Sequence, residues 1–445
     1  MRHKLDYLFD FLALIDPLRY QNFHSSICSF PDVDNLDEFA KSLIQEDYTY
    51  TTIDARKRDM AYQAFLLGII AFNKKSILDS TSNPSITDNY IFLRKYYHPL
   101  WSFYILCIRL LAFNNPIIEI HAYYNAIHVR KLILSKIDCT AEFIGYKLID
   151  KSRKVCVIIP TLNRYIYLND ALKDLESQTY KNFEVIIVDQ NDIPDVSFYE
   201  TFSLDIKLIK QSEKALWLAR NTAIKLTDAE LILLYDDDSR VGFDWIESHI
   251  KCLDFFGADI SSGVSISVIG AKVPEHYSIF RVGDQLDTGN VMLKKSIFKK
   301  VGLFDRQFEK QRMGDGEFGL RCHISGIKNV NNPVAKRLHL KASTGGLRQM
   351  GSWDGIRPKN LLSPRPIPSV LYFSRKYVGN KLSVLFLLVT VPMSIVPYKF
   401  KGNKFLLLSS YFILLITWPL IAFQVFKSWY LATLKLNQGP RIDSL

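Results

Sequence analysis

Three consecutive aspartates, Asp236, Asp237 and Asp238, are the residues whose types and spacing point most directly to chemistry. They follow residues 231–235, five apolar or aromatic residues that predict a short buried strand. Burying three like charges is costly, so we expect the aspartates at the strand's exit, open to solvent or to a cation. Mg2+ and Mn2+ prefer oxygen ligands and commonly bridge carboxylates to phosphates. The triplet alone does not distinguish such a site from a solvated acidic turn.

Other polar residues follow two further apolar runs, residues 155–160 and 183–188. Amphipathic segments separate these runs, which is typical of parallel strands joined by helices. The polar residues are Thr161, Asn163 and Arg164 after the first run and Asp189 after the second. In an open parallel sheet the carboxyl ends of the strands line one crevice, where ligands bind. Three loops would therefore meet at one edge, which favours a functional role for the triplet.

Composition and charge narrow the class of protein. The chain has 445 residues, of which 48% are hydrophobic and 23% are charged, enough for two or three domains with a large core. The net charge of +11 favours anionic partners such as nucleotides, nucleic acid or acidic lipid surfaces. The six cysteines are far apart and form no CxxC motif. This argues against a structural zinc site and a disulfide framework, and it fits a reducing compartment.

The segments on either side of this region have a different character. Residues 1–150 are predicted to be mostly helical and contain no chemical motif. Within them, residues 100–120 are long enough to suggest a membrane span. Arg109 and the Asn114-Asn115-Pro116 break favour a buried helix pair instead, because a charge near the centre of a span is costly. Residues 151–365 carry the strand and helix alternation, and residues 366–445 are hydrophobic and basic.

The central region resembles the inverting family 2 glycosyltransferases of GT-A fold over about residues 153–345. The resemblance is carried by six motifs in order: VIIPTLNR, EVIIVDQND, ARN, LYDDD, TGNVMLKKSIFKKVGLFD and GDGEFGLR. It implies an α/β domain with a mostly parallel central sheet that binds a nucleotide-sugar. The implied activity is hexosyl transfer to a hydroxyl of a glycan or lipid-linked acceptor by an inverting single displacement, in cell-surface polysaccharide synthesis.

The resemblance also assigns the donor site. The nucleotide would lie against Pro160, Thr161, Asn163, Arg164, Asp189, Arg220, Asp236 and Asp237. Asp189 would contact the base, and its alternative role is a strand-end turn cap. Arg220 would lie near the diphosphate or support the triplet, and the alternative is a helix-surface arginine. The family often has a DDGS-type run where this chain has DQND, so the identity of the base stays open.

A divalent metal, Mn2+ or Mg2+, is implied as the cofactor. Asp238 would be its first ligand and His339 a further one, while Asp236 would contact the ribose or a metal-bound water. The metal would neutralise the leaving diphosphate as a Lewis acid. A structural or surface role for His339 is the alternative.

The acceptor side depends on the stretch Gly314-Asp315-Gly316-Glu317. The family's catalytic base usually lies in a Glu-Asp motif that opens a helix, so Asp315 falls on the base position and Gly314 replaces the glutamate. A carboxylate there would take the proton of the acceptor hydroxyl as it attacks the anomeric carbon. A helix N-cap is the alternative role for Asp315. The sugar or acceptor pocket is expected to include Gly289, Asn290, Glu317 and Trp353.

Two apolar runs, residues 382–398 and 405–426, dominate the C-terminal segment. The second has 22 residues without a charge, and residues 371–445 carry nine Lys or Arg and one acidic residue. Such a segment fits a membrane surface, which it could span, re-enter or lie upon. The alternative is a buried helical hairpin of a soluble protein. We expect a protein on the cytoplasmic side of the cell membrane, peripheral or anchored through these helices.

Two rival functions make different demands on the sequence. A nucleotidyltransferase would usually have a glycine-rich phosphate loop after the first strand, and PTLNR contains no glycine. A non-catalytic nucleotide-binding or lipid-binding membrane protein on the same fold is the second rival. Nucleic acid is not expected as a partner, because the positive charge concentrates beside the apolar tail and not on an aromatic-interleaved basic face.

Overall fold

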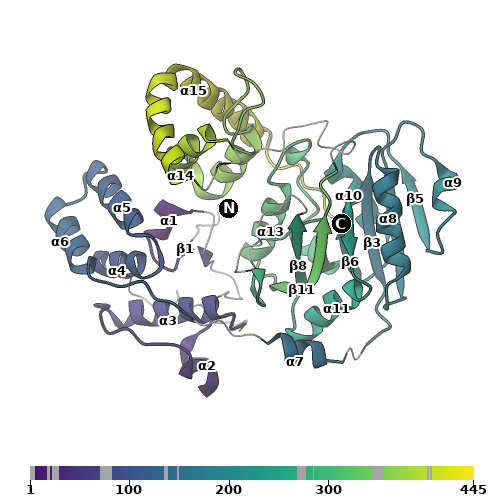
Figure 1. Ribbon diagram of the computed structural model, residues 1–445, viewed down its shortest axis with the longest axis horizontal. Coiled ribbons are helices and arrows are strands. Elements are labelled where there is room, and N and C mark those ends of the chain that lie inside the picture. The colour runs from purple at the N-terminus through teal and green to yellow at the C-terminus, as the bar shows by residue number, and fades with distance from the viewer. Residues whose placement is uncertain are drawn as a thin grey trace. The chain divides into compact units, whose positions relative to one another are not determined.

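The computed structural model divides the chain into two compact units, residues 1–137 with 374–392, and residues 138–373 with 393–445 (Figure 1). It describes residues 6–17, 21–22, 30–70, 83–134, 139–147, 150–267, 277–283, 285–342, 355–397, 400 and 403–445. Residues 374–392 are grouped with the first unit and residues 393–445 with the second, and the predicted division into three domains stays a prediction.

The described part of the second unit contains a nine-stranded sheet. Its parallel half has the order β5-β4-β3-β6, formed by β3 (Val155–Thr161), β4 (Phe183–Asp189), β5 (Ile206–Lys210) and β6 (Leu231–Tyr235). The apolar runs described above predict β3, β4 and β6. Every residue of β3 and β6 is buried, which explains why both read as continuous apolar runs.

The other half of the sheet is mixed. Strand β10 (Asn290–Lys294) lies antiparallel between β6 and β8 (Ile260–Ser267). Strand β11 (Asn329–His339) runs parallel to β8 and antiparallel to β7 (Ser239–Val241) and β9 (Arg281–Val282). The C-terminal end of β11 therefore lies beside the chain that follows the aspartate triplet.

Helices pack against the sheet, among them α8 (Tyr165–Glu176), α10 (Leu216–Leu226) and α11 (Trp245–Phe255) (Figure 1). The other helices of this unit are α7 (Thr140–Gly145), α9 (Val196–Tyr199), α12 (Ser296–Val301), the 3-10 turn η4 (Arg306–Phe308) and α13 (Gly314–Ile324). Leu168, Ala171, Leu172 and Leu175 recur at helical spacing on α8, and all four are fully buried. Burying one leucine side chain stabilises the fold by about 1.5–3 kcal/mol.

The first unit is mostly helical, as expected. Its elements are β1 (Asp6–Tyr7), α1 (Leu12–Ile15), β2 (Gln21–Asn22), η1 (Val33–Asn35), α2 (Glu38–Ser42), α3 (Ile53–Leu67), α4 (Ile86–Tyr96), α5 (Pro99–Leu111) and α6 (Pro116–Ala126). Helices α3 and α4 share a buried polar cluster. Asp59 accepts hydrogen bonds from Lys95 Nζ at 2.7 Å and from Tyr96 Oη at 2.8 Å, so the buried carboxylate is compensated.

Two long apolar helices, α14 (Pro368–Ile395) and α15 (Lys404–Gln438), form the C-terminal segment, as predicted. Both are long and apolar enough to cross a membrane by length and composition. Gly379 interrupts α14 with φ 81° and ψ 177°. Many apolar side chains of α15 are exposed, among them Phe412, Leu415 and Ile416.

The chain beyond α15 returns to the second unit. Leu303 N donates to Asp443 O at 2.9 Å, and Arg306 N donates to Arg441 O at 3.0 Å. Gly302, at φ +78°, lies so close to Ile442 that a Cβ would stand 2.5 Å from its Cγ2. These contacts fix the loop between α12 and η4, which leads toward α13.

Candidate active site

The aspartate triplet lies at the carboxyl end of β6, but most of it is buried. The side chain of Asp236 is 28% exposed, whereas those of Asp237 and Asp238 are 5% and 2% exposed. The expectation that the triplet is open to solvent is therefore correct only for Asp236. Burial is tolerated because three arginines pair with the aspartates.

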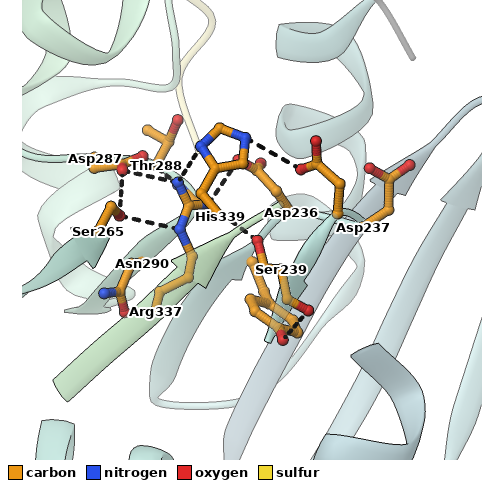
Figure 2. A network of polar contacts seen from close by, with 12 residues as sticks. Asp236, Asp237, Ser239, Ser265, Asp287, Thr288, Asn290, Arg337 and His339 are labelled. Atoms are coloured by element: carbon orange, nitrogen blue, oxygen red, sulfur yellow. Dashed lines mark hydrogen bonds and ion pairs between the residues drawn. The ribbon is translucent and has the colours of Figure 1, made fainter. Parts of the chain in front are cut away.

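Arg337, near the end of β11, is the centre of this network. Figure 2 shows its guanidinium between Asp236, Asp287 and Ser265. Nη1 donates to Asp236 Oδ2 at 2.8 Å, Nη2 to Asp287 Oδ2 at 2.9 Å, and Nε to Ser265 Oγ at 3.0 Å. Sequence reasoning missed Arg337. The available signal was its position two residues before His339, which places both side chains on one face of a strand.

Arg220, on α10, holds Asp236 from the other side. Its Nη2 donates to Asp236 Oδ1 at 2.8 Å, and its Nη1 donates to Thr288 Oγ1 at 2.7 Å. This is the supporting role that was one of two expectations for Arg220. Although burial opposes the effect, Arg337 and Arg220 hold the pKa of Asp236 well below its usual range.

Gly289 makes this double ion pair possible. A Cβ at position 289 would stand 1.7 Å from Arg337 Nη1 and 2.2 Å from Asp236 Oδ2. Any larger residue would push the two groups apart. Gly289 thus permits the close approach of its backbone to the ion pair, while its predicted place in a sugar pocket stays a prediction.

Asp237 faces the loop after β3. Its Oδ2 accepts from Thr161 Oγ1 at 2.8 Å, and its Oδ1 accepts from Arg164 Nη1 at 3.0 Å. Burial raises the pKa of Asp237 to about 7, and the neighbouring Asp238 adds to this effect. The predicted convergence of the loops after β3 and β6 is thereby found at Thr161 and Arg164.

Asp238 and His339 form the best candidate pair of metal ligands. Asp238 Oδ1 lies 3.3 Å from His339 Nε2, and Asp238 Oδ2 accepts from Ala342 N at 3.1 Å. Burial opposes ionisation, but His339 and then Arg164 lower the pKa of Asp238. The carboxylate is therefore ionised, as a ligand must be.

The donor set fits a divalent ion only in part. Within the described ranges, no group of three or more His, Cys, Asp or Glu could hold a metal. Both oxygens of Asp236 are engaged by arginines, which leaves one carboxylate and one imidazole. Catalytic Mg2+ is commonly held by one or two carboxylates plus substrate phosphates, and imidazole suits the transition metals better. Asp238 and His339 fit such a substrate-completed site.

Asp189 is buried at the end of β4 and is fully hydrogen-bonded. Its Oδ2 accepts from Tyr165 Oη at 2.6 Å and from Tyr199 Oη at 2.7 Å. Its Oδ1 accepts from Asn191 N at 2.9 Å. Asn191 in turn accepts from Asn163 N at 2.6 Å, which joins the loops after β3 and β4. This geometry favours the turn-cap alternative for Asp189.

Asp315 lies in the first turn of α13 and is not its N-cap, which is Met313 at φ 82°. Its Oδ1 accepts from Gly316 N at 2.8 Å. Burial raises the pKa of Asp315, and the charge of Asp287 adds to this, whereas the more distant Arg220 opposes it. Asp315 and Asp287 are therefore electrostatic neighbours at the edge where Arg220 holds Asp236.

Several predicted pocket residues do not face this edge. Asn290 is fully buried, with Oδ1 accepting from Trp245 Nε1 at 2.8 Å and Nδ2 donating to Ala335 O at 3.0 Å. Glu317 is fully buried against Arg321, at 3.1 Å. Both stabilise the interior and are not part of a pocket. Pro160 is inside β3, paired with Val188, and Trp353 lies outside the described residues.

Comparison with known proteins finds a family model that matches this part of the chain. The model described as Glycosyl transferase family 2 matches residues 156–320. Glycosyltransferase GlyA of Streptococcus pneumoniae is 26% identical over 164 residues, 36% of this chain and 22% of that protein. Glycosyltransferase AglE of Haloferax volcanii is 28% identical over 163 residues, 34% of this chain and 52% of that protein. The chain thus spans about a fifth of the first relative's length and about half of the second's.

A solved structure similar to the chain is a mannosyltransferase from Pyrobaculum calidifontis in complex with GDP-Man and Mn2+. It has 16% sequence identity and a TM-score of 0.43, and the match covers 66% of this chain and 91% of that one.

Proposed function

Since residues 156–320 match the model described as Glycosyl transferase family 2 and lie on a mixed α/β sheet, we propose that the chain is a GT-A glycosyltransferase that transfers a sugar from a nucleotide-sugar to an acceptor hydroxyl. The transfer is an inverting, metal-assisted single displacement. The sugar is a hexose, and the acceptor is a glycan or a lipid-linked glycan in cell-surface polysaccharide synthesis. The nucleotide lies against the carboxyl ends of β3, β4 and β6, where Asp236 presents its partly exposed carboxylate.

The observation that carries this proposal is the position and environment of Asp315. Its raised pKa, caused first by burial and then by Asp287, makes its carboxylate a stronger base than a solvated aspartate. The carboxylate accepts one backbone hydrogen bond, from Gly316 N, which orients it without neutralising it. Asp315 can therefore take a proton from an acceptor hydroxyl at the edge that carries Asp236.

The leaving group is handled by a separate set of residues. Arg164 and Arg220 bring positive charge to the carboxyl ends of β3 and β6, where the diphosphate would lie. Asp238 and His339 would hold the metal, which when bound supplies Lewis-acid stabilisation of the departing diphosphate. Arg337 fixes Asp236 and Asp287 relative to each other.

The test is Asp315→Asn in the full-length protein, with nucleoside diphosphate release measured over a panel of nucleotide-sugars. We expect turnover to fall at least a hundredfold, the lower end of what a general base contributes, while donor affinity is retained. The matched control is Glu317→Gln, an acid two residues further along α13 that pairs internally with Arg321. It should lower thermal stability but leave turnover per folded molecule nearly unchanged. Normal turnover of Asp315→Asn would disprove the assignment of the base.

Membrane association through the C-terminal helices is part of the same proposal. Exposed Phe412, Leu415 and Ile416 lie on a helix of sufficient length to span. Deleting the tail would also remove the contacts of Arg441 and Asp443 with the catalytic unit, so a substitution is the sharper test. Replacing the three apolar residues by lysine should weaken membrane binding, whereas replacing exposed Ile193 and Ile166 in the catalytic unit should not. An unchanged membrane affinity of the lysine variant would disprove anchoring by α15.

A further inference from the structure

Helices α5 and α6 of the first unit form a hairpin whose turn is sharply defined. Asn115 caps α6 by accepting from Ile117 N at 3.0 Å and Ile118 N at 3.3 Å. Phe113, in the connection, has a left-handed conformation with φ 59° and is 97% exposed. A phenylalanine held almost entirely outside the protein at a helix corner is costly in water. Figure 1 shows α5 and α6 beside α4.

The charged residues of the hairpin are turned inward and neutralise each other. Arg109 Nη2 lies 2.6 Å from Glu119 Oε1, and Glu119 is 1% exposed. Glu119 also accepts from Tyr90 Oη at 3.0 Å, and the Arg109 guanidinium lies 4.7 Å from the centre of the Phe11 ring. Arg109 and the Asn114-Asn115-Pro116 break favoured a buried helix pair over a membrane span. The ion pair with Glu119 removes the objection to Arg109, because its charge is neutralised and does not face outward.

Most of the exposed side chains of the hairpin are apolar, although Asn115, His121 and Asn125 are also exposed. Leu111 is 75% exposed and Ile117 is 78% exposed, on either side of Phe113. Exposed apolar side chains continue along both helices with Leu100, Phe103, Ile118, Ile120 and Tyr124. So many exposed apolar side chains on one hairpin are typical of a site of contact with a protein or a membrane.

A basic cavity of about 470 Å³ lies at the other end of the hairpin. Its lining includes Arg94, His98, His128, Arg130 and Lys131, and among the lining residues that the structure describes none is acidic. Arg94 Nη2 donates to Ile127 O at 2.7 Å, while its buried Nε has no acceptor in the part of the chain that the structure describes. Leu132 N donates to Lys95 O at 3.0 Å and fixes the loop that carries Arg130 and Lys131. The cavity is a pre-formed site for an anion.

The distance between the exposed Phe113 and the basic cavity is close to the thickness of one lipid leaflet. Helix α5 has 13 residues, so about 20 Å separates the cavity from Phe113. The hydrocarbon of one leaflet is about 15 Å thick, half of a bilayer core. We propose that the α5–α6 hairpin docks on an anionic phospholipid bilayer, with its exposed apolar side chains in one leaflet and the basic cavity around a headgroup phosphate. The charge of the cavity favours this occupant over a second copy of the chain, whose net charge is +11.

The first test places a photoreactive benzoylphenylalanine at position 113 of the full-length protein, reconstituted in liposomes containing anionic phospholipid. The matched control has the same residue at Phe39 on α2, an aromatic residue of the same unit that is 68% exposed. We expect lipid adducts at position 113 and none at position 39. Adducts only with protein, either a second copy or another segment of this chain, would overturn the proposal, as would equal lipid labelling at both positions.

The second test addresses the headgroup site through Arg130→Gln with Lys131→Gln, in the chain that carries the probe at position 113. The control is Lys299→Gln with Lys300→Gln, an adjacent exposed basic pair on α12. In vesicles with anionic phospholipid, the first pair should lower lipid adducts about fivefold for each charge removed, and the control pair should not. In neutral phosphatidylcholine vesicles the two double variants should give equal yields of lipid adducts at position 113. Equal yields from the two double variants in anionic vesicles would disprove headgroup recognition by the cavity.

Discussion

The indole ring of Trp217 occupies the space that a side chain at position 314 would need. A Cβ on Gly314 would stand 2.3 Å from Trp217 Cζ2. Trp217 is itself fixed, because its Nε1 donates to Phe308 O at 3.2 Å and its ring lies 5.1 Å from that of Phe304. The ring therefore leaves no room at position 314 for the glutamate that the resemblance implies there. Arg220 lies over the same ring at 5.3 Å, so Trp217 connects α13 with the arginine that holds Asp236.

We predict that Gly314→Ala destabilises the protein by about 1–3 kcal/mol, as overpacking does. A loss of stability would be diagnostic of the clash, because replacing glycine by alanine within a helix otherwise stabilises a protein by up to about 1 kcal/mol. Gly316→Ala is the matched control in the same helix turn, since its Cβ would meet only Met313 Cε at 3.6 Å. Chemical denaturation measures both variants. Shortening the ring with Trp217→Leu should reduce the penalty at position 314, and an unchanged penalty would contradict the packing argument.

Gly289→Ala should weaken donor binding at least tenfold. Its methyl group would separate Arg337 from Asp236, and the displaced carboxylate would no longer be held for the ribose or for a metal-bound water. The control is Gly145→Ala on α7, where a Cβ would meet nothing within 4 Å. Titration calorimetry with a nucleotide-sugar that the enzyme binds gives the dissociation constants. If Gly289→Ala binds as tightly as the unmodified protein, the Arg337–Asp236 pair does not contribute to donor binding.

The parallel half of the sheet could be predicted because each of its strands is recognisable from its own short stretch of sequence. Strands β3, β4 and β6 are continuous apolar runs, and polar residues follow them directly. Strand β11 could not be recognised in the same way, because its sequence NVNNPVAKRLH is largely polar and contains a proline. Arg337 was therefore missed, although it organises the site through contacts with residues about fifty and a hundred positions earlier.

Residue type near a motif was a poor guide to which way a side chain points. Asn290 and Glu317 lie within recognisable motifs, yet both make internal hydrogen bonds. For two other residues the expected exposure was wrong. Asp237 and Asp238 were expected to be open because isolated buried charges are costly, but Arg164 pairs with both at 3.0 and 3.2 Å. Such compensation depends on the tertiary structure, which the spacing of residues along the chain does not reveal.

The buried His249 on α11 predicts a pH dependence of stability. Burial lowers its pKa from 6.5 to about 4, while its Nε2 donates to Asn290 Oδ1 at 3.1 Å. Between these values the unfolded chain binds a proton that the folded protein does not, so stability falls as pH decreases from 6.5 to 4. The loss should approach about 3 kcal/mol and then level off.

The measurement compares the unmodified protein with His249→Gln, because other groups titrate in the same range. The difference in free energy of unfolding between the two proteins should shrink from pH 7 to pH 4. His121→Gln, an exposed histidine on α6, should leave the pH dependence as it is. A constant difference between the unmodified protein and His249→Gln would show that His249 does not titrate as its burial requires.

Donor binding should depend on a divalent ion held by Asp238 and His339. These two groups are the carboxylate and imidazole that remain after the arginines have engaged both oxygens of Asp236. We expect EDTA to weaken nucleoside diphosphate binding and Mn2+ to restore it. His339→Gln should raise the Mn2+ concentration needed for half-maximal restoration at least tenfold, and His128→Gln should not. Paramagnetic relaxation of water by Mn2+ gives the metal affinity independently of turnover. Diphosphate binding that is indifferent to EDTA would remove the metal from the role assigned to this pair.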